Sequence, residues 1–237
     1  SFVMLIPAVI DAMSSGKEWI NFIIASSITC FIGISLFLVT HGKSSKLDIR
    51  QIFILTTASW LTTAFFGSLP FYFCSYQISF VDAFFESMSG ITTTGSTVLT
   101  DLDNISKGIL IWRALLQWLG GIGFVILAIA ALPKLKVSGN QLFQSEFSDK
   151  LTKTRPSLAS LASWIGAIYI FITALCTFFY WAAGMSSFDS IAHAMTTIAT
   201  GGFSTSDFSL GFFSDPKIEI VATVFMILGS LPFIVFV

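Results

Sequence analysis

The sequence predicts an all-α membrane protein, and three observations lead to this fold class. The chain of 237 residues is 54% apolar and only 11% charged, whereas soluble domains carry about 25% charged residues. Its mean hydropathy is +0.85, and long charge-free runs alternate with short stretches rich in Thr, Ser and Gly. The net charge of −1, from 12 basic and 13 acidic residues, excludes a polybasic nucleic-acid binder, so no nucleic acid is expected as a partner.

The distances between charged residues locate the predicted spans, because a helix needs about 20 apolar residues to cross the bilayer. The apolar residues before Asp11 predict the end of an incomplete first helix. Five charge-free runs then follow as candidate spans: Trp19–Gly42, Gln51–Val81, Ala114–Pro133, Pro156–Phe188 and Ile220–Val237. Because the sequence starts and stops inside apolar runs, we expect it to be a piece of a longer protein.

Two further charge-free stretches, Ser87–Thr100 and Ser190–Ser206, are too short or too polar to cross as helices. Lipid does not tolerate exposed backbone polar groups, so such a segment at membrane depth is buried in protein or faces water. We interpret both stretches as candidate re-entrant pore loops. Ordinary extramembrane loops rich in turn residues are the alternative interpretation.

Basic residues orient the chain, because short cytoplasmic loops collect Lys and Arg. Eight of them lie on one side of the predicted spans: Lys43, Lys46, Arg50, Lys134, Lys136, Lys150, Lys153 and Arg155. The opposite side carries both candidate loops and most acidic residues, so we expect the loops to enter from outside. The acidic mouth either concentrates cations or is an ordinary solvated rim.

The two candidate loops align with each other at a fixed offset of 107 residues. The match has no gap from Val81 to Thr97, and its five identical pairs are Asp82/Asp189, Met88/Met195, Ile91/Ile198, Thr93/Thr200 and Gly95/Gly202. Each copy lies between two candidate spans, so the predicted unit is helix, short helix, loop and helix. We divide the chain into an N-terminal transmembrane helix pair (1–46), a first repeat (47–136), a basic cytoplasmic connector (137–156) and a truncated second repeat (157–237).

The residues of this unit suit a cation. A short helix that enters the membrane from its acidic first turn points the negative end of its dipole toward a central cavity. Beyond it, an extended chain can replace the hydration shell of an ion with carbonyl oxygens. Gly95 and Gly202 fit this need because glycine reaches unusual backbone angles, and Thr93 and Thr200 add hydroxyl oxygens. For either glycine alone, a helix terminator or a tight turn is the alternative.

The second predicted helix of the first repeat holds polar and small residues. If Arg113 is buried, it needs a partner such as Glu86, Asp101 or Asp103; snorkelling to the head groups is the alternative. His193 occupies the place that Glu86 has in the first copy, as a pH sensor or as a hydrogen-bonded packing residue. Three nearby glycines predict close packing against the pore loop, with a hinge as the alternative: Gly120, Gly121 and Gly123.

Four segments resemble the TrkH membrane subunits of Trk-type potassium uptake proteins, in the Trk/Ktr/HKT superfamily: SGITTTGSTV at Ser89–Val98, WRALLQWLGGIGFVILAIAALP at Trp112–Pro133, QLFQSE at Gln141–Glu146 and TTIATGGFSTSDFS at Thr196–Ser209. The resemblance implies a potassium-channel-like fold with four helix–pore loop–helix repeats around one filter, of which the third and fourth are absent here. It implies that potassium, the transported ion, is bound by filter carbonyls at Thr92, Thr93, Thr94, Gly95, Ala199, Thr200, Gly201 and Gly202.

The resemblance also implies a location and partners. It implies a multi-pass protein of the bacterial inner membrane, with pore loops entering from the periplasmic side, and a homodimer surrounded by membrane lipid. It implies a TrkA-type cytoplasmic nucleotide-binding regulatory subunit, which the segment Lys134–Arg155 would contact; phospholipid head groups are an equal alternative. The sequence has no P-loop lysine motif, no HExxH and no Ser/His/Asp cluster, so we expect no organic cofactor and no enzyme activity.

The predicted function is potassium uptake, because the membrane potential supplies about 2.3 kcal/mol per charge per 100 mV without nucleotide hydrolysis. Two alternatives are open. A less selective potassium and sodium channel or symporter is one, since Ser96 follows the first filter glycine. A non-conducting truncated membrane subunit is the other, and a fragment, a split gene and a remnant would each show only two repeats.

Overall fold

The computed structural model describes residues 1–41, 49–131 and 158–231, and all regular elements in these ranges are helices. The predicted all-α fold class is confirmed. The chain starts with the 3-10 turn η1 (Phe2–Met4) and α1 (Leu5–Met13), and α2 (Trp19–Thr40) packs back against both. The predicted connector 137–156, with the basic segment from Lys134 to Arg155, lies outside the described residues.

Two units of helix, short helix and helix follow, as the internal repeat predicts. The first contains α3 (Ile49–Phe73), α4 (Phe80–Ile91), the turn η2 (Leu102–Asn104) and α5 (Lys107–Ala131). The second contains α7 (Leu158–Ala182), α8 (Ser187–Ile198), the turn η4 (Ser209–Phe213) and α9 (Pro216–Ser230). The short helices α4 and α8 keep the 107-residue offset at both of their ends.

Matching serine caps explain why both short helices begin where they do. The Oγ of Ser79 accepts a hydrogen bond from the backbone N–H of Asp82 at 3.1 Å and donates one to its carboxylate at 2.7 Å. Ser186 and Asp189 form the same pair at 3.1 and 2.6 Å. A cap of this kind satisfies a free N–H of the first turn, and the carboxylate suits the positive end of the helix.

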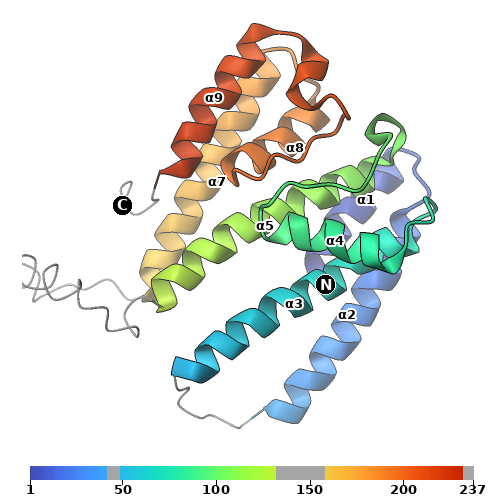
Figure 1. Cartoon of the computed structure of the whole chain (residues 1–237), viewed down its shortest axis with the longest axis vertical. Helices are drawn as coiled ribbons and strands as arrows, with labels where there is room; N and C mark the ends of the chain where they lie inside the picture. Colours follow the sequence, from blue (N-terminus) through green and yellow to red (C-terminus); the bar gives the residue numbers. More distant parts are fainter. Residues whose placement is uncertain (42–48, 132–157, 232–237) are drawn as a thin grey trace, which may run out of the picture.

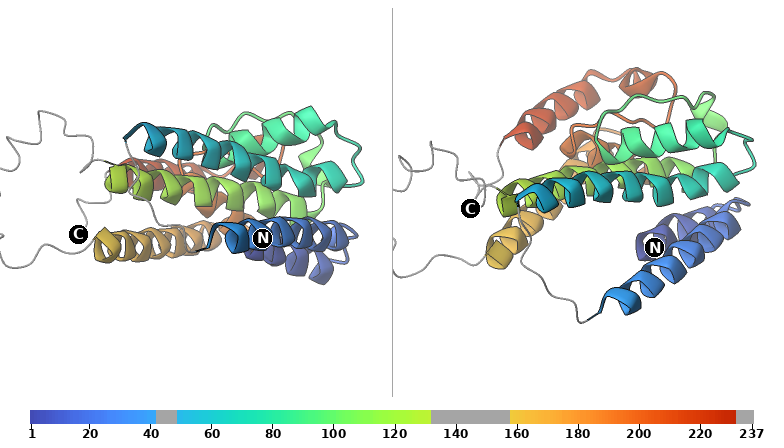
Figure 2. Two further views of the ribbon diagram at one scale, coloured as in Figure 1. Left: turned by 90° about the horizontal axis from the view of Figure 1, so that it is seen from below. Right: turned by 60° about the horizontal axis from the view of Figure 1, so that its bottom comes forward.

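Helix α5 lies at the centre of the molecule, where it packs against α1, α4, α7 and α8 (Figure 1). The hairpin of α1 and α2 lies on one flank, beside α5 and α3 (Figure 2). Helices α7, α8 and α9 pack on one another on the other side of α5. A single helix of the first repeat therefore contacts the short helices of both repeats.

Two buried acidic residues attach the N-terminal hairpin to the first repeat. Asp11 accepts hydrogen bonds from the backbone N–H of Glu18 at 2.8 Å and from that of Gly108 at 3.2 Å, in the first turn of α5. The carboxylate of Glu18 accepts from the backbone N–H of Ser75 at 3.3 Å, just beyond α3. Asp11, which interrupts an apolar run in the sequence, thus caps a helix of the neighbouring unit.

The outer surface of the helices is apolar, as a lipid-facing surface requires. Large apolar side chains on α2 and α7 are 62–74% exposed: Phe31, Leu38, Val39, Trp164 and Phe171. Among the described helices, Trp19–Thr40 and Ala162–Ala182 are each long and apolar enough to cross a membrane by composition alone. Helices α3 and α5 are also 25 residues long.

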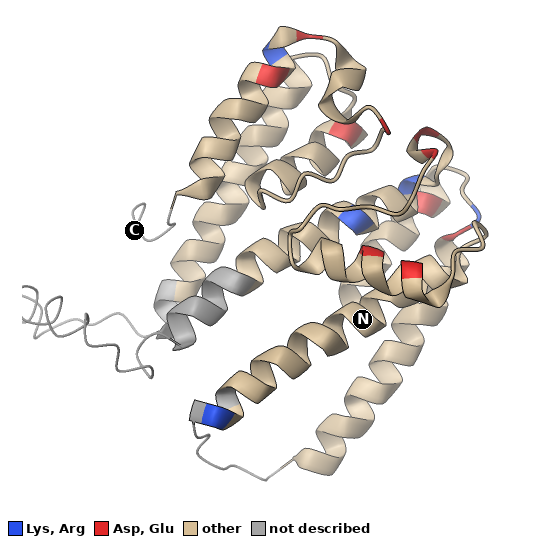
Figure 3. Ribbon diagram, viewed as in Figure 1, with Lys and Arg blue, Asp and Glu red and all other residues tan. Residues whose placement is uncertain are grey.

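Charged residues are distributed unevenly along the molecule. The described acidic residues gather toward the end where α3 and α7 finish, whereas Arg50 lies in the first turn of α3 at the opposite end (Figure 3). Of the eight basic residues that orient the predicted spans, Arg50 is the one within the described ranges. Both candidate pore loops therefore follow helices that start at the acidic end.

Candidate ion site at the two pore loops

The two pore loops leave their short helices by the same backbone path. Three hydrogen bonds close each helix end at equivalent positions: Thr92 N to Met88 O, Thr93 N to Gly90 O and Thr94 N to Ser89 O at 2.9–3.0 Å, and Ala199 N to Met195 O, Thr200 N to Thr197 O and Gly201 N to Thr196 O at 2.9–3.1 Å. The sequence alignment at 107 residues is therefore also an alignment of main-chain bonding.

Positive backbone angles recur at the same two places of each loop. The φ angle is +55° at Thr93 and +79° at Gly95, and +53° at Thr200 and +83° at Gly202. We expected unusual angles at the glycines, but not at the threonines, since a β-branched residue disfavours the left-handed region. Two strained threonines at matched positions indicate that the surrounding structure imposes this path on both loops.

The two loops meet at their glycines. A Cβ atom built on Gly95 would overlap the carbonyl oxygen of Gly201, so the first loop approaches the second as closely as the backbone allows. A Cβ on Gly202 would meet no atom within 4 Å. Of the eight predicted ligand residues, Thr92, Thr94, Thr200 and Gly202 are exposed, Thr93 and Gly95 are half-buried, and Ala199 and Gly201 are buried.

Glycines of the longer helices let the short helices α4 and α8, the pore helices, pack closely. A Cβ on Gly120 of α5 would overlap the carbonyl oxygen of Ile91, the last residue of α4. A Cβ on Gly229 of α9 would lie 2.8 Å from the carbonyl oxygen of Ile198, the last residue of α8. The expected close packing is seen for Gly120 and for Gly121, whose Cβ would lie 3.2 Å from the Cα of Ala199 in the second loop, whereas a Cβ on Gly123 would meet no described atom within 4 Å.

A buried ion pair lies behind the loops. Nε of Arg113 is 2.8 Å from Oε1 of Glu86, and the two side chains are 1% and 0% exposed. Arg113 also donates to the hydroxyl of Thr97 at 3.1 Å and to the carbonyl oxygen of Ser204 at 2.7 Å. Of the three partners considered from the sequence, Glu86 is the one that Arg113 contacts. The snorkelling alternative is wrong, since the side chain is enclosed.

Equivalent positions tie each short helix to the chain after its loop. In the first repeat the carboxylate of Glu86 accepts from the Thr97 hydroxyl at 2.9 Å and from the Val98 N–H at 3.0 Å. In the second, Nε2 of His193 is 3.0 Å from the Ser204 hydroxyl, and its Nδ1 is 2.9 Å from the Asp189 carbonyl oxygen. His193 is therefore a hydrogen-bonded packing residue, as one of its two interpretations has it.

Gln117 supports the second loop from α5. Its Oε1 accepts a hydrogen bond from the backbone N–H of Phe203 at 3.1 Å, and a Cβ on Gly201 would overlap its amide group. The side chain is 0% exposed, and its Nε2 has no hydrogen-bond partner among the described residues. The sequence analysis missed this contact. The spacing of Arg113 and Gln117, one helical turn apart on one face of α5, is the signal that could have found it.

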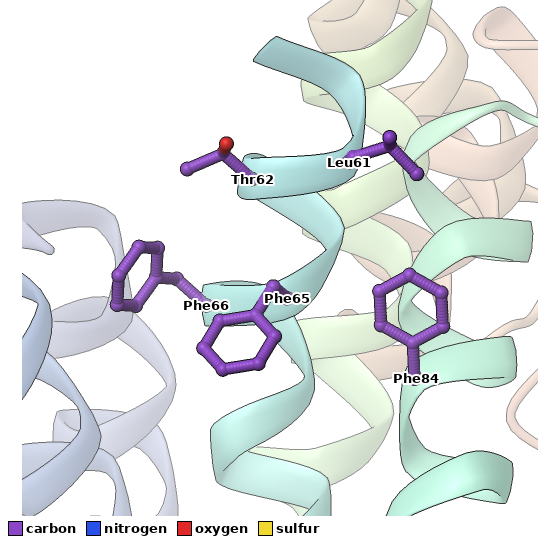
Figure 4. Close-up of a pocket in the computed structure, with 5 residues that line it drawn as sticks. All are labelled: Leu61, Thr62, Phe65, Phe66 and Phe84. Carbon is purple, nitrogen blue, oxygen red and sulfur yellow. The ribbon is translucent and has the colours of Figure 1, made fainter. Parts of the chain in front are cut away.

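In the described chain, neither a cluster of metal-ligating side chains nor the groove between α3 and α4 offers an ion site comparable to the loops. Within residues 1–41, 49–131 and 158–231, no three His, Cys, Asp or Glu side chains are placed to hold a metal ion. A groove of about 410 Å³ lies between α3 and α4, where Phe84 faces Leu61 and Phe65 across it (Figure 4). Its lining is apolar apart from Thr62, so it offers no set of oxygen ligands.

A helical membrane protein with two pore-loop repeats is the class that this fold and these loops define. The chain belongs to the TrkH family, described as a cation transport protein, whose model matches residues 18–237. As a member of a cation transport family, it is not an enzyme.

Individual relatives agree with this assignment. The chain is 39% identical to the Trk system potassium uptake protein TrkI of Halomonas elongata, over 99% of this chain and 48% of that protein. It is 38% identical to the Trk system potassium uptake protein TrkH of Escherichia coli K12, over 97% and 48%. The crystal structure of the potassium transporter TrkH from Vibrio parahaemolyticus matches 96% of this chain and 46% of its own, with a TM-score of 0.85 and 35% identity. The chain spans about half the length of these relatives.

Proposed function

We propose that the protein takes up potassium across the bacterial inner membrane through a channel-like pore, and that the two loops supply carbonyl ligands to the ion. The ligand residues are Thr92, Thr93, Thr94 and Gly95 in the first loop and Ala199, Thr200, Gly201 and Gly202 in the second. The observation that carries this proposal is the repeated backbone path, with positive φ at the same two positions of each loop. Positive φ at alternate residues lets successive carbonyls face one side, which a regular strand does not allow.

The electrostatics of the short helices support a cation at the loops. Helices α4 and α8 end at Ile91 and Ile198, directly before the proposed ligands. Neither helix has a basic residue in its last turn, so its negative dipole end is not neutralised locally. An ion held by main-chain oxygens at this point gains from two such helix ends.

The relatives support potassium as the ion, since they are named potassium uptake proteins and share 38–39% identity with this chain. Because the chain spans about half of their length, we propose that a complete pore needs two further repeats beyond this sequence. We also propose the domain limits 1–46, 47–136, 137–156 and 157–237. Loop entry from the periplasmic side is supported by the eight basic residues that the sequence places on the other side of the predicted spans; Arg50, the described one among them, lies in the first turn of α3, at the end opposite the acidic residues (Figure 3).

The proposed partners follow from the same family. We propose a homodimer in lipid, regulated by a TrkA-type cytoplasmic nucleotide-binding subunit at the basic segment Lys134–Arg155. The relatives' printed name, a Trk system, supports an assembly of several components. Deletion of the regulator gene should lower uptake without changing which ion is preferred.

Substitution of the loop glycines tests the proposal. We expect Gly95→Ser and Gly202→Ser, in the complete gene product, to reduce rubidium uptake and to increase competition by sodium. Gly95→Ser should have the larger effect, since its Cβ would collide with the carbonyl of Gly201, whereas Gly202 would suffer only the strain of its positive φ. Tracer uptake by cells that lack other potassium systems is the measurement.

Gly184→Ser is the matched control, because Gly184 also has a positive φ, +107°, and an empty Cβ position but lies in the turn between α7 and α8. It should leave ion preference unchanged. If Gly95→Ser and Gly202→Ser left the preference for rubidium over sodium as unchanged as Gly184→Ser does, the ligand assignment would be overturned.

A less selective potassium and sodium pathway is the second candidate, and the observation that favours it is the exposed Ser96 beside Gly95. Equal uptake of sodium and rubidium by the unaltered protein would support it. No uptake of either ion would support a non-conducting membrane subunit instead.

A further inference from the structure

One face of α5 holds the backbone of the opposite repeat's loop. Arg113 donates to the carbonyl oxygen of Ser204 at 2.7 Å, and Gln117 accepts from the N–H of Phe203 at 3.1 Å. The two side chains are one turn apart on the helix, and the two backbone groups belong to consecutive residues. A donor and an acceptor of the first repeat thus fix one short segment of the second, directly after Gly202.

Arg113 is bound equally firmly to its own repeat. Its guanidinium contacts Glu86 at 2.8 Å and the Thr97 hydroxyl at 3.1 Å, and the ring centre of Phe203 lies 4.2 Å from its central carbon. Charged hydrogen bonds in an enclosed site are strong and directional. One rigid planar group therefore links the chain after the first loop to the chain after the second.

Gln117 is placed between the two loops themselves. A Cβ on Gly201 would overlap its amide, and a Cβ on Gly95 would lie 3.7 Å from its Nε2. In the part of the chain that the structure describes, this buried nitrogen has no hydrogen-bond partner, which is unfavourable for stability. The oxygen of Gln117 holds the N–H of Phe203 while its nitrogen lies near Gly95, so the amide ties α5 to the second loop at the point where the two loops meet.

The second repeat lacks this arrangement. Gly120 of α5 and Gly229 of α9 both pack on the last carbonyl of their pore helices, which sets the register between the two helices. At this register the positions of Arg113 and Gln117 correspond to Ala222 and Met226, neither of which can form such bonds. In the described part of the chain, the bonds from Arg113 and Gln117 thus connect one pair of neighbouring loops.

We infer that Arg113 and Gln117 are positioning residues that fix the spacing of the two loops and thereby set which alkali cation the loops accept. The inference rests on the proposed function, because it takes the loops as ion ligands. Ions of different radius need different distances between opposing oxygens, and a site discriminates by distance only where its supports hold the ligands to a fraction of an ångström. Arg113 and Gln117 do not touch the ion; they act through the backbone of Phe203 and Ser204.

Ion competition in two conservative variants tests this inference. Arg113→Lys keeps the positive charge but loses the planar fork, and Gln117→Met keeps the volume but loses the acceptor. In the complete gene product we expect the preference for rubidium over sodium to fall about tenfold for Arg113→Lys, the effect of one charged hydrogen bond. For Gln117→Met we expect a fall of about fivefold, as for a neutral bond. Rubidium uptake is measured against rising sodium and normalised to the amount of protein in the membrane.

Lys107→Gln is the matched control, since it removes a positive charge from the exposed first turn of the same helix; its ammonium lies 5.4 Å from the ring centre of Phe188, at the start of α8, and the described contacts of Lys107 do not include either loop. It should leave the ion preference unchanged. The inference would be overturned if both variants lowered total uptake but left the rubidium-to-sodium ratio unchanged. It would also be overturned if Lys107→Gln changed this ratio as much as they do. If Arg113→Lys does not reach the membrane, Gln117→Met alone decides by the same ratio. Lack of rubidium uptake by the unaltered protein would be a different result, which overturns the proposed function itself.

Discussion

The two pore loops follow the same backbone path, but different side chains support them. In the first repeat the carboxylate of Glu86 holds the chain after the loop and is paired with Arg113; in the second, His193 takes its place and holds Ser204. Both repeats share the serine cap, the positive φ angles and the closely packed glycine. The path is therefore set by the shared features, and each repeat has its own support behind it.

This difference has a consequence for stability. The first repeat contains an enclosed ion pair, whereas at the matching place of the second repeat His193 bonds to the Ser204 hydroxyl and to the backbone carbonyl of Asp189. Removal of one member of a buried ion pair is costly, because the other charge stays in a site that water does not reach. The two repeats should thus respond very differently to matched substitutions.

The largest difference is expected between Glu86→Gln and His193→Gln. Glu86→Gln leaves Arg113 without a counter-charge and should lower the free energy of unfolding by about 3–5 kcal/mol. His193→Gln removes one neutral hydrogen bond and should cost about 1 kcal/mol. Chemical unfolding of the purified protein in detergent is the measurement.

Two further variants sharpen this comparison. Glu219→Gln changes an exposed carboxylate on α9 and should have almost no effect. Glu86→Gln combined with Arg113→Met removes both charges and should recover most of the lost stability. Equal losses for Glu86→Gln and His193→Gln would mean that the buried charge does not distinguish the repeats.

An intermediate difference is expected at the packed glycines. Gly120→Ala would drive a methyl group into the carbonyl of Ile91 and should cost about 2–3 kcal/mol, whereas Gly229→Ala has slightly more room and should cost about 1 kcal/mol. Gly123→Ala on α5 is the control, since its Cβ would meet no described atom within 4 Å, and better helix propensity should stabilise it by up to about 1 kcal/mol. Thermal unfolding in detergent ranks the three, and an order other than this would show that the helices can separate without penalty.

Much of the fold follows from the sequence because its signals are local. Charge spacing locates α2, α3, α5 and α7, and the ungapped alignment of the loops gives both pore helices with the same offset at both ends. The caps that Ser79 and Ser186 form with Asp82 and Asp189 are likewise contained within four residues. The alignment also brings Glu86 and His193 to one position, although it does not show what each side chain binds.

The contacts between the repeats could not be predicted in this way. The bond from Arg113 to Ser204 joins residues 91 positions apart, and the one from Phe203 to Gln117 joins residues 86 apart. Both depend on α5 lying between α4 and α8, which no local pattern encodes. Asp11 shows the same limit: in the sequence it interrupts an apolar run, and in the fold it caps a helix almost a hundred residues away. The ion ligands at the loops stay a prediction that uptake measurements must test.

The smallest expected effect concerns the caps that the two repeats share. Ser79→Ala and Ser186→Ala should each lower the free energy of unfolding by about 1 kcal/mol, and by equal amounts, since the two caps have the same geometry. Ser27→Ala is the control, because the exposed Ser27 hydroxyl bonds only within its own helix and its loss should cost little.

The two caps share no partner, so if the repeats are independent, the losses in the double variant Ser79→Ala with Ser186→Ala should add to about 2 kcal/mol. A loss beyond that sum, measured by chemical unfolding in detergent, would mean that α5 couples the two pore helices; unequal single losses would mean that the shared path is held differently in each repeat.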